Sequence, residues 1–274
     1  SWSVLGAVQN QTGTVCAGSY TVTVTDAQGC TATASVTVTE PPLLAVTASG
    51  TNASCFGVCN GTTSTVTSGG TTPYTYAWTG PTAIAGSAGA TLCAGTYTVT
   101  VTDSKGCIAT ASYTVTEPPL LTVVVTGNDA SCFGICDGDA TATPSGGTSG
   151  YTYQWNPAGG LGTAATTASS LCAGTAGVTV TDALGCIATG TFAITEPTAV
   201  TATNSSTPAA CGVSDGTADV VAAGGAGGYT YVWAPAPGTG QGTASVTGLA
   251  GGAYTVTITD ANGCVLVENV TVTN

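Results

Sequence analysis

The stretch AGTYTVTVTDSKGC, residues 94–107, decides the fold of this chain. Threonine alternates with Tyr97, Val99 and Val101, so one face of an extended segment is apolar and the other carries hydroxyl groups. Residues 103–106 then have the Asp-x-x-Gly composition of a tight turn. The stretch therefore predicts a half-buried β-strand that turns back into a second strand.

This stretch belongs to a repeat of about 78 residues that runs through the whole chain. The same motif stands at 17–30, 173–186 and 251–264. The tryptophans and the Glu-Pro junctions keep the same spacing. We expect complete repeats at 41–117, 118–196 and 197–274, and the second half of a repeat at 1–40. The repeated markers are Trp2, Trp78, Trp155, Trp233, Glu40-Pro41, Glu117-Pro118 and Glu196-Pro197.

Each complete repeat has the pattern of six or seven short strands separated by glycine-rich turns. A Leu-x-x-Gly-x-Tyr run that ends at Tyr97 resembles a tyrosine corner, and it recurs at Tyr254 but has Ala176 in the third repeat. The predicted fold class is all-β: a tandem array of Ig/fibronectin-like β-sandwich domains stapled by disulfides.

Composition excludes several function classes. The chain has one basic residue, Lys105, no histidine and a net charge of −12. Nucleic acids and anionic membranes are bound mainly through Lys and Arg, so we expect neither partner. No apolar run is long enough to span a membrane. Without histidine the commonest general base is missing, and we expect no catalytic residues, no enzyme activity and no cofactor.

The twelve cysteines indicate disulfides and an oxidising, extracellular location. Four cysteines per repeat allow three pairings. The fourth repeat has Ser214 and Ala250 where the second has Cys59 and Cys93, and two cysteines lost together suggest partners. We therefore predict the pairs Cys55–Cys107, Cys59–Cys93, Cys132–Cys186, Cys136–Cys172 and Cys211–Cys264. Zinc is the weaker alternative, because the fourth repeat offers too few ligands.

Cys16 and Cys30 have no obvious partners, because their expected counterparts fall in the missing half of the first repeat. They could pair with residues of a preceding segment, with each other, or with a neighbouring subunit that completes the half-domain. The first explanation is favoured.

The combined motif resembles the SprB repeat. It consists of a cysteine-rich turn with Asn/Asp-Gly, then YTYxW, then L-x-x-G-x-Y-x-V-x-V-x-D-x-x-G-C, then Glu-Pro. The resemblance implies a very large surface protein of Bacteroidota, secreted by the type IX system and carrying no catalytic residues. YTYxW and YTVTVTD also resemble PKD-type surface domains.

Two further kinds of site are considered. The aromatic residues of the third strand could stack on sugars, but they are more simply core residues. The acids Asp137, Asp139 and Glu117 could bind calcium, although Asn or Asp before Gly is also what a tight turn requires. The aromatic set is Tyr74, Tyr76, Trp78, Tyr151, Tyr153, Trp155, Tyr229, Tyr231 and Trp233.

The expected function is a structural extracellular filament or adhesin stalk, with cell-surface attachment or gliding-type adhesion. Its partners would be neighbouring copies or upstream repeats of the same polymer, and surface polysaccharide. The Glu-Pro junctions leave little slack between domains, since proline restricts itself and the residue before it. The alternative is an array of carbohydrate-binding modules in a secreted protein.

Overall fold

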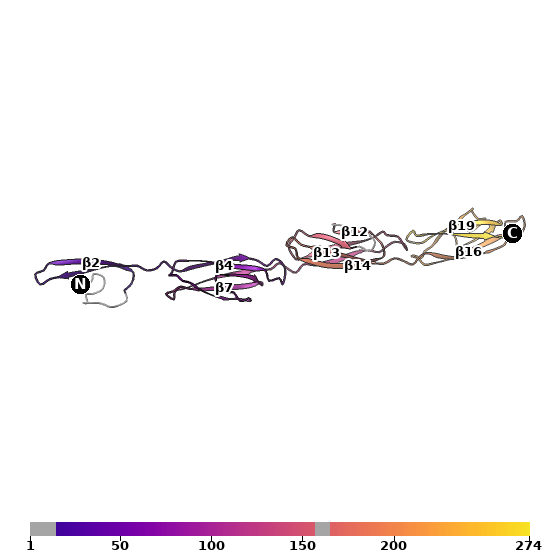
Figure 1. Cartoon of the computed structure of the whole chain (residues 1–274). Helices are drawn as coiled ribbons and strands as arrows, with labels where there is room; N and C mark the ends of the chain where they lie inside the picture. The colour runs from indigo at the N-terminus through magenta and orange to yellow at the C-terminus, as the bar shows by residue number, and fades with distance from the viewer. Residues whose placement is uncertain (1–14, 157–164) are drawn as a thin grey trace. The chain divides into compact units, whose positions relative to one another are not determined.

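The computed structural model describes residues 15–156 and 165–274. All regular structure in these residues is β-strand (Figure 1). The chain divides into two compact units, Ser1–Glu117 and Pro118–Asn274, and the division falls at the predicted junction after Glu117. Within the described ranges there is no helix with the length and apolarity needed to cross a membrane.

The strands recur in sets of six. The half-repeat at the start of the chain has β1 (Gly18–Thr25) and β2 (Thr31–Val38). The second repeat has β3 (Ala45–Thr51), β4 (Gly61–Ser68), β5 (Thr75–Thr79), β6 (Ala88–Leu92), β7 (Gly95–Thr102) and β8 (Ile108–Val115). The third has β9 (Thr122–Asn128), β10 (Gly138–Ser145), β11 (Thr152–Asn156), β12 (Thr167–Leu171), β13 (Gly174–Thr181) and β14 (Ile187–Ile194). The fourth has β15 (Thr201–Thr207), β16 (Gly216–Ala223), β17 (Thr230–Ala234), β18 (Ser245–Leu249), β19 (Gly252–Thr259) and β20 (Val265–Val272).

Each set of six strands forms two antiparallel three-stranded sheets. In the second repeat the sheet orders are β3-β4-β6 and β5-β7-β8, and the third and fourth repeats have the same orders. The hairpin β1-β2 corresponds to β7-β8. The prediction of an all-β array of Ig-like sandwich units is therefore confirmed.

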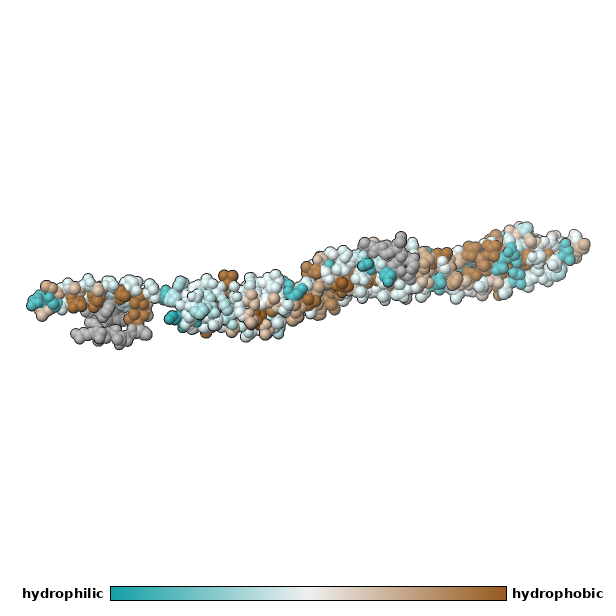
Figure 2. All heavy atoms as spheres, in the orientation of Figure 1, coloured by the Kyte–Doolittle hydropathy of each residue, from teal (hydrophilic) through white to brown (hydrophobic). Residues whose placement is uncertain are grey.

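The core of each sandwich lies between its two sheets. Tyr97, Val99 and Val101 of β7 are fully buried, as their alternation with threonine predicts. Ala176, which replaces the corner tyrosine in the third repeat, is also fully buried. Threonine and serine are common on the outer faces, but exposed apolar residues such as Val124, Val221 and Val267 lie among them. Figure 2 accordingly shows a pale surface interrupted by brown patches.

The tyrosine corners form where the sequence has the tyrosine. The Tyr97 hydroxyl donates to Cys93 O at 3.0 Å, and the Tyr254 hydroxyl donates to Ala250 O at 3.1 Å. Tyr20 makes the same bond to Cys16 O at 2.7 Å in the half-repeat. Each bond ties one end of the long central strand to the residues before it.

Two of the predicted disulfides are present: Cys59–Cys93 and Cys136–Cys172. Both are short-range staples at the loop that carries the Asn/Asp-Gly turn. Cys16 and Cys30 are exposed free thiols, so they do not pair with each other.

The three predicted long bridges are wrong. Cys132 is bonded to Cys264 instead of Cys186, which takes part in another disulfide. Cys211 is therefore not bonded to Cys264 and is a free exposed thiol. Cys55 is disulfide-bonded, but Cys107 is free and exposed.

The length of the last strand explains these errors. Cys186 comes just before β14, whereas Thr195, just after β14, accepts a hydrogen bond from Ala130 beside Cys132. The 8 residues of β14 span about 26 Å at roughly 3.3 Å per residue. A disulfide needs Cα atoms within about 7 Å of each other. The two cysteines thus lie at opposite ends of one sandwich.

Candidate functional site

The candidate site is the covalent joint between the third and fourth repeats, inside the second compact unit. The disulfide Cys132–Cys264 closes a separation of 132 residues with its Cα atoms 5.7 Å apart. Cys132 lies in the loop between β9 and β10, and Cys264 lies in the turn between β19 and β20. The end of one sandwich is therefore bonded to the beginning of the next.

A hydrogen bond runs beside the disulfide. Asn262 Nδ2 donates to Ser131 O at 2.9 Å. Cys264 Sγ also lies 3.4 Å from Ser131 O, a contact without hydrogen bonding because a disulfide sulfur has no proton. Ser131, directly before Cys132, and Asn262, two residues before Cys264, thus contact each other across the two repeats. The joint therefore has a defined geometry as well as a covalent bond.

The loop that carries Cys132 is held by carboxylates of its own repeat. Asp137 Oδ1 accepts from Ser131 N at 2.8 Å, and Glu196 Oε2 accepts from Gly134 N at 2.6 Å. The Ser131 side chain, followed by its backbone N–H, holds the pKa of Asp137 below its ordinary value of 3.8. The glutamate of the Glu-Pro junction therefore anchors the loop, in addition to preceding the linker proline.

The turn that carries Cys264 is organised by Asp260. Its Oδ1 accepts from Asn262 N and Cys264 N, both at 2.9 Å. Its Oδ2 accepts from Ala226 N at 2.7 Å, in the glycine-rich loop after β16. The Ala226 bond is the main reason that the pKa of Asp260 is lowered, and the turn donors add to it against the effect of burial. Asp260 thus links two loops at the joint, beyond the local turn bonding that its motif predicts.

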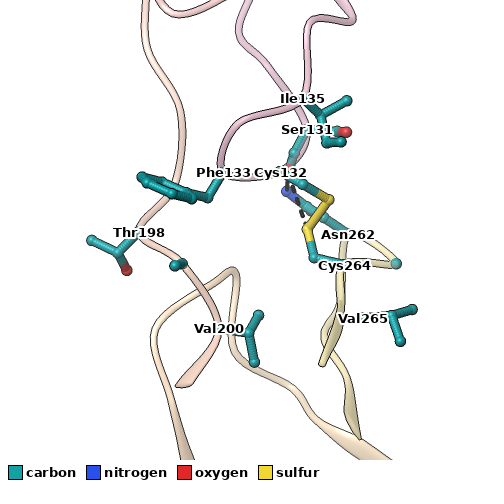
Figure 3. A pocket seen from close by; sticks show the side chains of 11 residues that line it. Ser131, Cys132, Phe133, Ile135, Thr198, Val200, Asn262, Cys264 and Val265 are labelled. Carbon is teal, nitrogen blue, oxygen red and sulfur yellow. Dashed lines mark hydrogen bonds between the residues drawn. A yellow bond between two sulfur atoms is a disulfide. The ribbon is translucent and has the colours of Figure 1, made fainter. Parts of the chain in front are cut away.

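A cavity of about 500 Å³ opens beside the disulfide. In Figure 3 the Phe133 ring extends toward Thr198 on one side of it, and the disulfide closes the other side. Phe133, Ile135 and Val265 are all about half exposed or more. No residue that lines this cavity carries a charge, so its chemistry favours neutral and apolar contacts.

The aromatic residues predicted for the third strand are engaged inside their sandwiches. Trp155 and Trp233 are 3% and 2% exposed, and Trp78 packs against the core of its repeat. Trp233 Nε1 donates to Thr243 O at 3.0 Å, and the hydroxyl of Tyr151 donates to Gly146 O at 2.7 Å. Tyr74 and Tyr229 make the same bond to Gly69 O and Gly224 O, Tyr153 and Tyr231 pack against their cores, and the Tyr76 hydroxyl reaches Thr67.

The acids considered for calcium accept hydrogen bonds: Asp137 and Glu117 from the cysteine loops, and Asp139 across the β9-β10 strand pair. Asp137 accepts from Ser131, Asp139 from the Asn128 side chain at 2.8 Å, and Glu117 from Gly57 N at 2.6 Å. Among residues 15–156 and 165–274, no three His, Cys, Asp or Glu side chains gather in a way that could hold a metal ion.

Sequence reasoning missed the joint because it searched for partners within one repeat. The signal that could have found it is the position of the cysteines relative to the last strand. The first cysteine of a repeat stands in a loop near the end of that strand, and the closing cysteine stands just before its start. Only a neighbouring repeat brings such positions together.

Comparison with solved structures finds chains that match this one at low TM-scores. The N-terminal eight Ig domains of Down Syndrome Cell Adhesion Molecule match at 9% identity and a TM-score of 0.28 over 93% of this chain and 51% of that one. Domains 7, 8 and 9 of the S-layer protein SbsC match at 18% identity and a TM-score of 0.26, over 69% of this chain and 72% of that one. The Protocadherin GammaB4 extracellular domain matches at 14% identity and a TM-score of 0.29, over 93% of this chain and 54% of that one. TM-scores this low carry no argument about function, and this chain spans about half the length of the first structure.

A sequence search finds no match among curated proteins. The family model of the SprB repeat matches residues 47–83, 122–160 and 203–238. Each match covers the first half of one repeat, including its cysteine loop and its YTYxW strand. The resemblance predicted from the motifs is confirmed by matches at three places in the chain, and these fall within the predicted segments 41–117, 118–196 and 197–274.

Proposed function

We propose that this chain works as a structural filament or adhesin stalk at the cell surface, in which SprB repeats are locked to their neighbours by disulfides. The observation that carries the proposal is the Cys132–Cys264 bond between consecutive repeats. Neither Cys132 nor Cys264 belongs to the hydrophobic core of its sandwich. The bond fixes the position of one sandwich on the next.

The joint is suited to tension. A force applied between Pro118 and Asn274 passes through the sulfur–sulfur bond rather than through residues 133–263. Those residues include nearly all of the fourth sandwich and most of the third. The strands between the two cysteines are therefore shielded from this force, whereas β9 and β20 lie outside the bonded interval and carry it.

The chemistry of the surface supports an extracellular, non-enzymatic role. Disulfides persist in oxidising compartments. The carboxylates at the closing turns and cysteine loops are occupied by backbone N–H donors, which leaves them poorly placed for acid–base catalysis. Among the uses of such a stalk, the resemblance to SprB repeats favours gliding-type adhesion.

Single-molecule stretching of the full chain, held through attachment points at Pro118 and Asn274 so that only the second unit is under load, tests the proposal. Under oxidising conditions, the 132-residue separation closed by Cys132–Cys264 should not extend. Reduction should release an additional contour length of roughly 460 Å, at about 3.5 Å per residue. The double variant Cys132→Ser/Cys264→Ser should show that length without reductant.

The matched control is Cys136→Ser/Cys172→Ser. This pair closes 36 residues that already lie inside the larger loop, so the oxidised variant should extend like the unchanged chain. If the unchanged chain released the same length before and after reduction, the joint would carry no tension and the proposed role would fail. Immunogold labelling of intact cells then tests the surface location.

A further inference from the structure

The fourth repeat keeps a cysteine at the joint position but has no partner for it. Cys211 occupies the position of Cys132, and its thiol is free and exposed. We propose that the loop around Cys211 is a docking site for the closing turn of a second copy of this chain. The docked turn is fixed by a disulfide between Cys211 and the Cys30 of that copy.

The Cys211 loop is built like the loop of the known joint. Ala209 N donates to Thr273 O at 2.8 Å, as Ala130 N donates to Thr195 O at 3.0 Å. Ala210 N donates to Asp215 Oδ1 at 2.7 Å, which matches the bond between Ser131 and Asp137. Cys211 is therefore presented at the same end of its sandwich, and Ala210 O stands where Ser131 O accepts the bond from Asn262.

The Cys30 turn is built like the turn that meets Cys132. Asp26 Oδ1 accepts from Gln28 N and Cys30 N, both at 2.9 Å, as Asp260 does from Asn262 and Cys264. Gln28 stands at the position of Asn262 and offers a side-chain amide of the same chemistry. Cys30 is a free exposed thiol.

No partner for Cys211 lies within its own repeat. Cys264 is already bonded to Cys132. It is also separated from the Cys211 loop by β20, whose 8 residues span about 26 Å. Because the loop of one copy meets the turn of another, the contact is head-to-tail and can propagate along a polymer.

The bond requires a disulfide oxidant, for which oxidised glutathione serves. The Cys30 thiolate attacks one sulfur of oxidised glutathione, forms a mixed disulfide and releases one glutathione thiolate. The Cys211 thiolate then attacks the Cys30 sulfur, and the second glutathione leaves and takes a proton. Two protein thiols are oxidised, and one glutathione disulfide is reduced to two thiols.

The test compares Cys30 with Cys16, a second free exposed thiol of the same half-repeat. Both variants are full-length and carry Cys107→Ser; one adds Cys16→Ser and the other Cys30→Ser. Each is incubated with oxidised glutathione, and crosslinked copies are measured by non-reducing electrophoresis and peptide mapping. Docking raises the effective concentration of the correct pair, so Cys211–Cys30 should form at least about tenfold faster than Cys211–Cys16. Gln28→Ala should slow the first reaction and leave the second unchanged.

Equal rates for the two variants, or Cys211–Cys211 as the main product, would overturn the inference. Mapping of Cys132–Cys264 in every variant shows that the second unit has folded. The inference rests on the proposed function as a covalently joined array, but the two fail differently. If Cys211 couples at random, the docking inference fails but the predicted stretching behaviour at Cys132–Cys264 is unaffected. If the stretching experiment fails at Cys132–Cys264, the proposed function fails, and the docking inference loses the joint on which it is based.

Discussion

Cys132 and Cys264 are bonded across 132 residues, and each stands at the end of its sandwich that faces the other. The bond lies beside the hydrogen bond from Asn262 to Ser131 O. Covalent attachment and polar contact thus coincide at one joint, and the predictions below follow from its parts and from the sandwiches that it connects.

Removal of the joint should lower the stability of the second unit. In the chain-entropy view, a closed loop of 132 residues is worth roughly 5 kcal/mol, and the 36-residue loop of Cys136–Cys172 roughly 4 kcal/mol. Cys132→Ser/Cys264→Ser should also separate the unfolding of the third and fourth repeats into two transitions. Cys136→Ser/Cys172→Ser should destabilise the third repeat alone. Calorimetry of both variants distinguishes these outcomes.

Asp260 should make the second unit sensitive to acid. The pKa of this carboxyl is lower in the folded chain than its ordinary value of 3.8, mainly because of the bond from Ala226 N. A lowered folded pKa contributes stability that is present above pH 3.8 and is lost as the pH falls through the folded pKa. Asp260→Asn should lower the melting temperature at pH 7 and flatten its decline in acid. An unchanged acid profile would contradict the assignment.

Gly147 should tolerate no side chain. Its φ is +61°, and a Cβ there would meet Asp182 Oδ2 at 2.6 Å. Gly147→Ala should therefore lower the free energy of unfolding by more than the roughly 1–2 kcal/mol that left-handed backbone strain alone costs. Gly185→Ala is the control, because its φ is +85° and nothing lies within 4 Å of the added Cβ. Chemical denaturation should rank Gly147→Ala as clearly the less stable of the two; equal losses would mean that the Asp182 contact is unimportant.

Trp233 should behave as a core residue. It is 2% exposed and lies opposite Val256 in the β17-β19 pair. Trp233→Ala should cost about 3–5 kcal/mol of unfolding free energy. Trp233→Phe should cost less, because it keeps an aromatic ring and loses only volume and the bond to Thr243 O. Denaturant titrations measure both; a near-neutral Trp233→Ala would place the ring outside the core.

Much of the fold was predictable because the repeat displays its own pattern several times. The buried face of β7 follows from the alternation of Tyr97, Val99 and Val101 with threonine. The short bridges follow from the joint loss of two cysteines in the fourth repeat. These features depend on residues that are close in sequence or belong to one sandwich, where periodicity and comparison between copies are informative.

The joint was not predictable by the same reasoning. Assigning Cys132 to Cys186 treats the repeat as closed on itself, and the rise of β14 along its 8 residues makes that pairing too long. The second function of Asp260, its bond to the loop at Ala226, was also hidden, because a turn motif shows its local bonds and not the loop packed above it.

Peptide mapping of the unreduced full chain tests the central claim most directly. Peptic digestion at low pH, which suppresses disulfide exchange, followed by mass spectrometry should recover Cys132 linked to Cys264, with Cys211 as a free thiol. Recovery of Cys132 linked to Cys186 together with Cys211 linked to Cys264 would contradict the account, because each repeat would then be closed on itself.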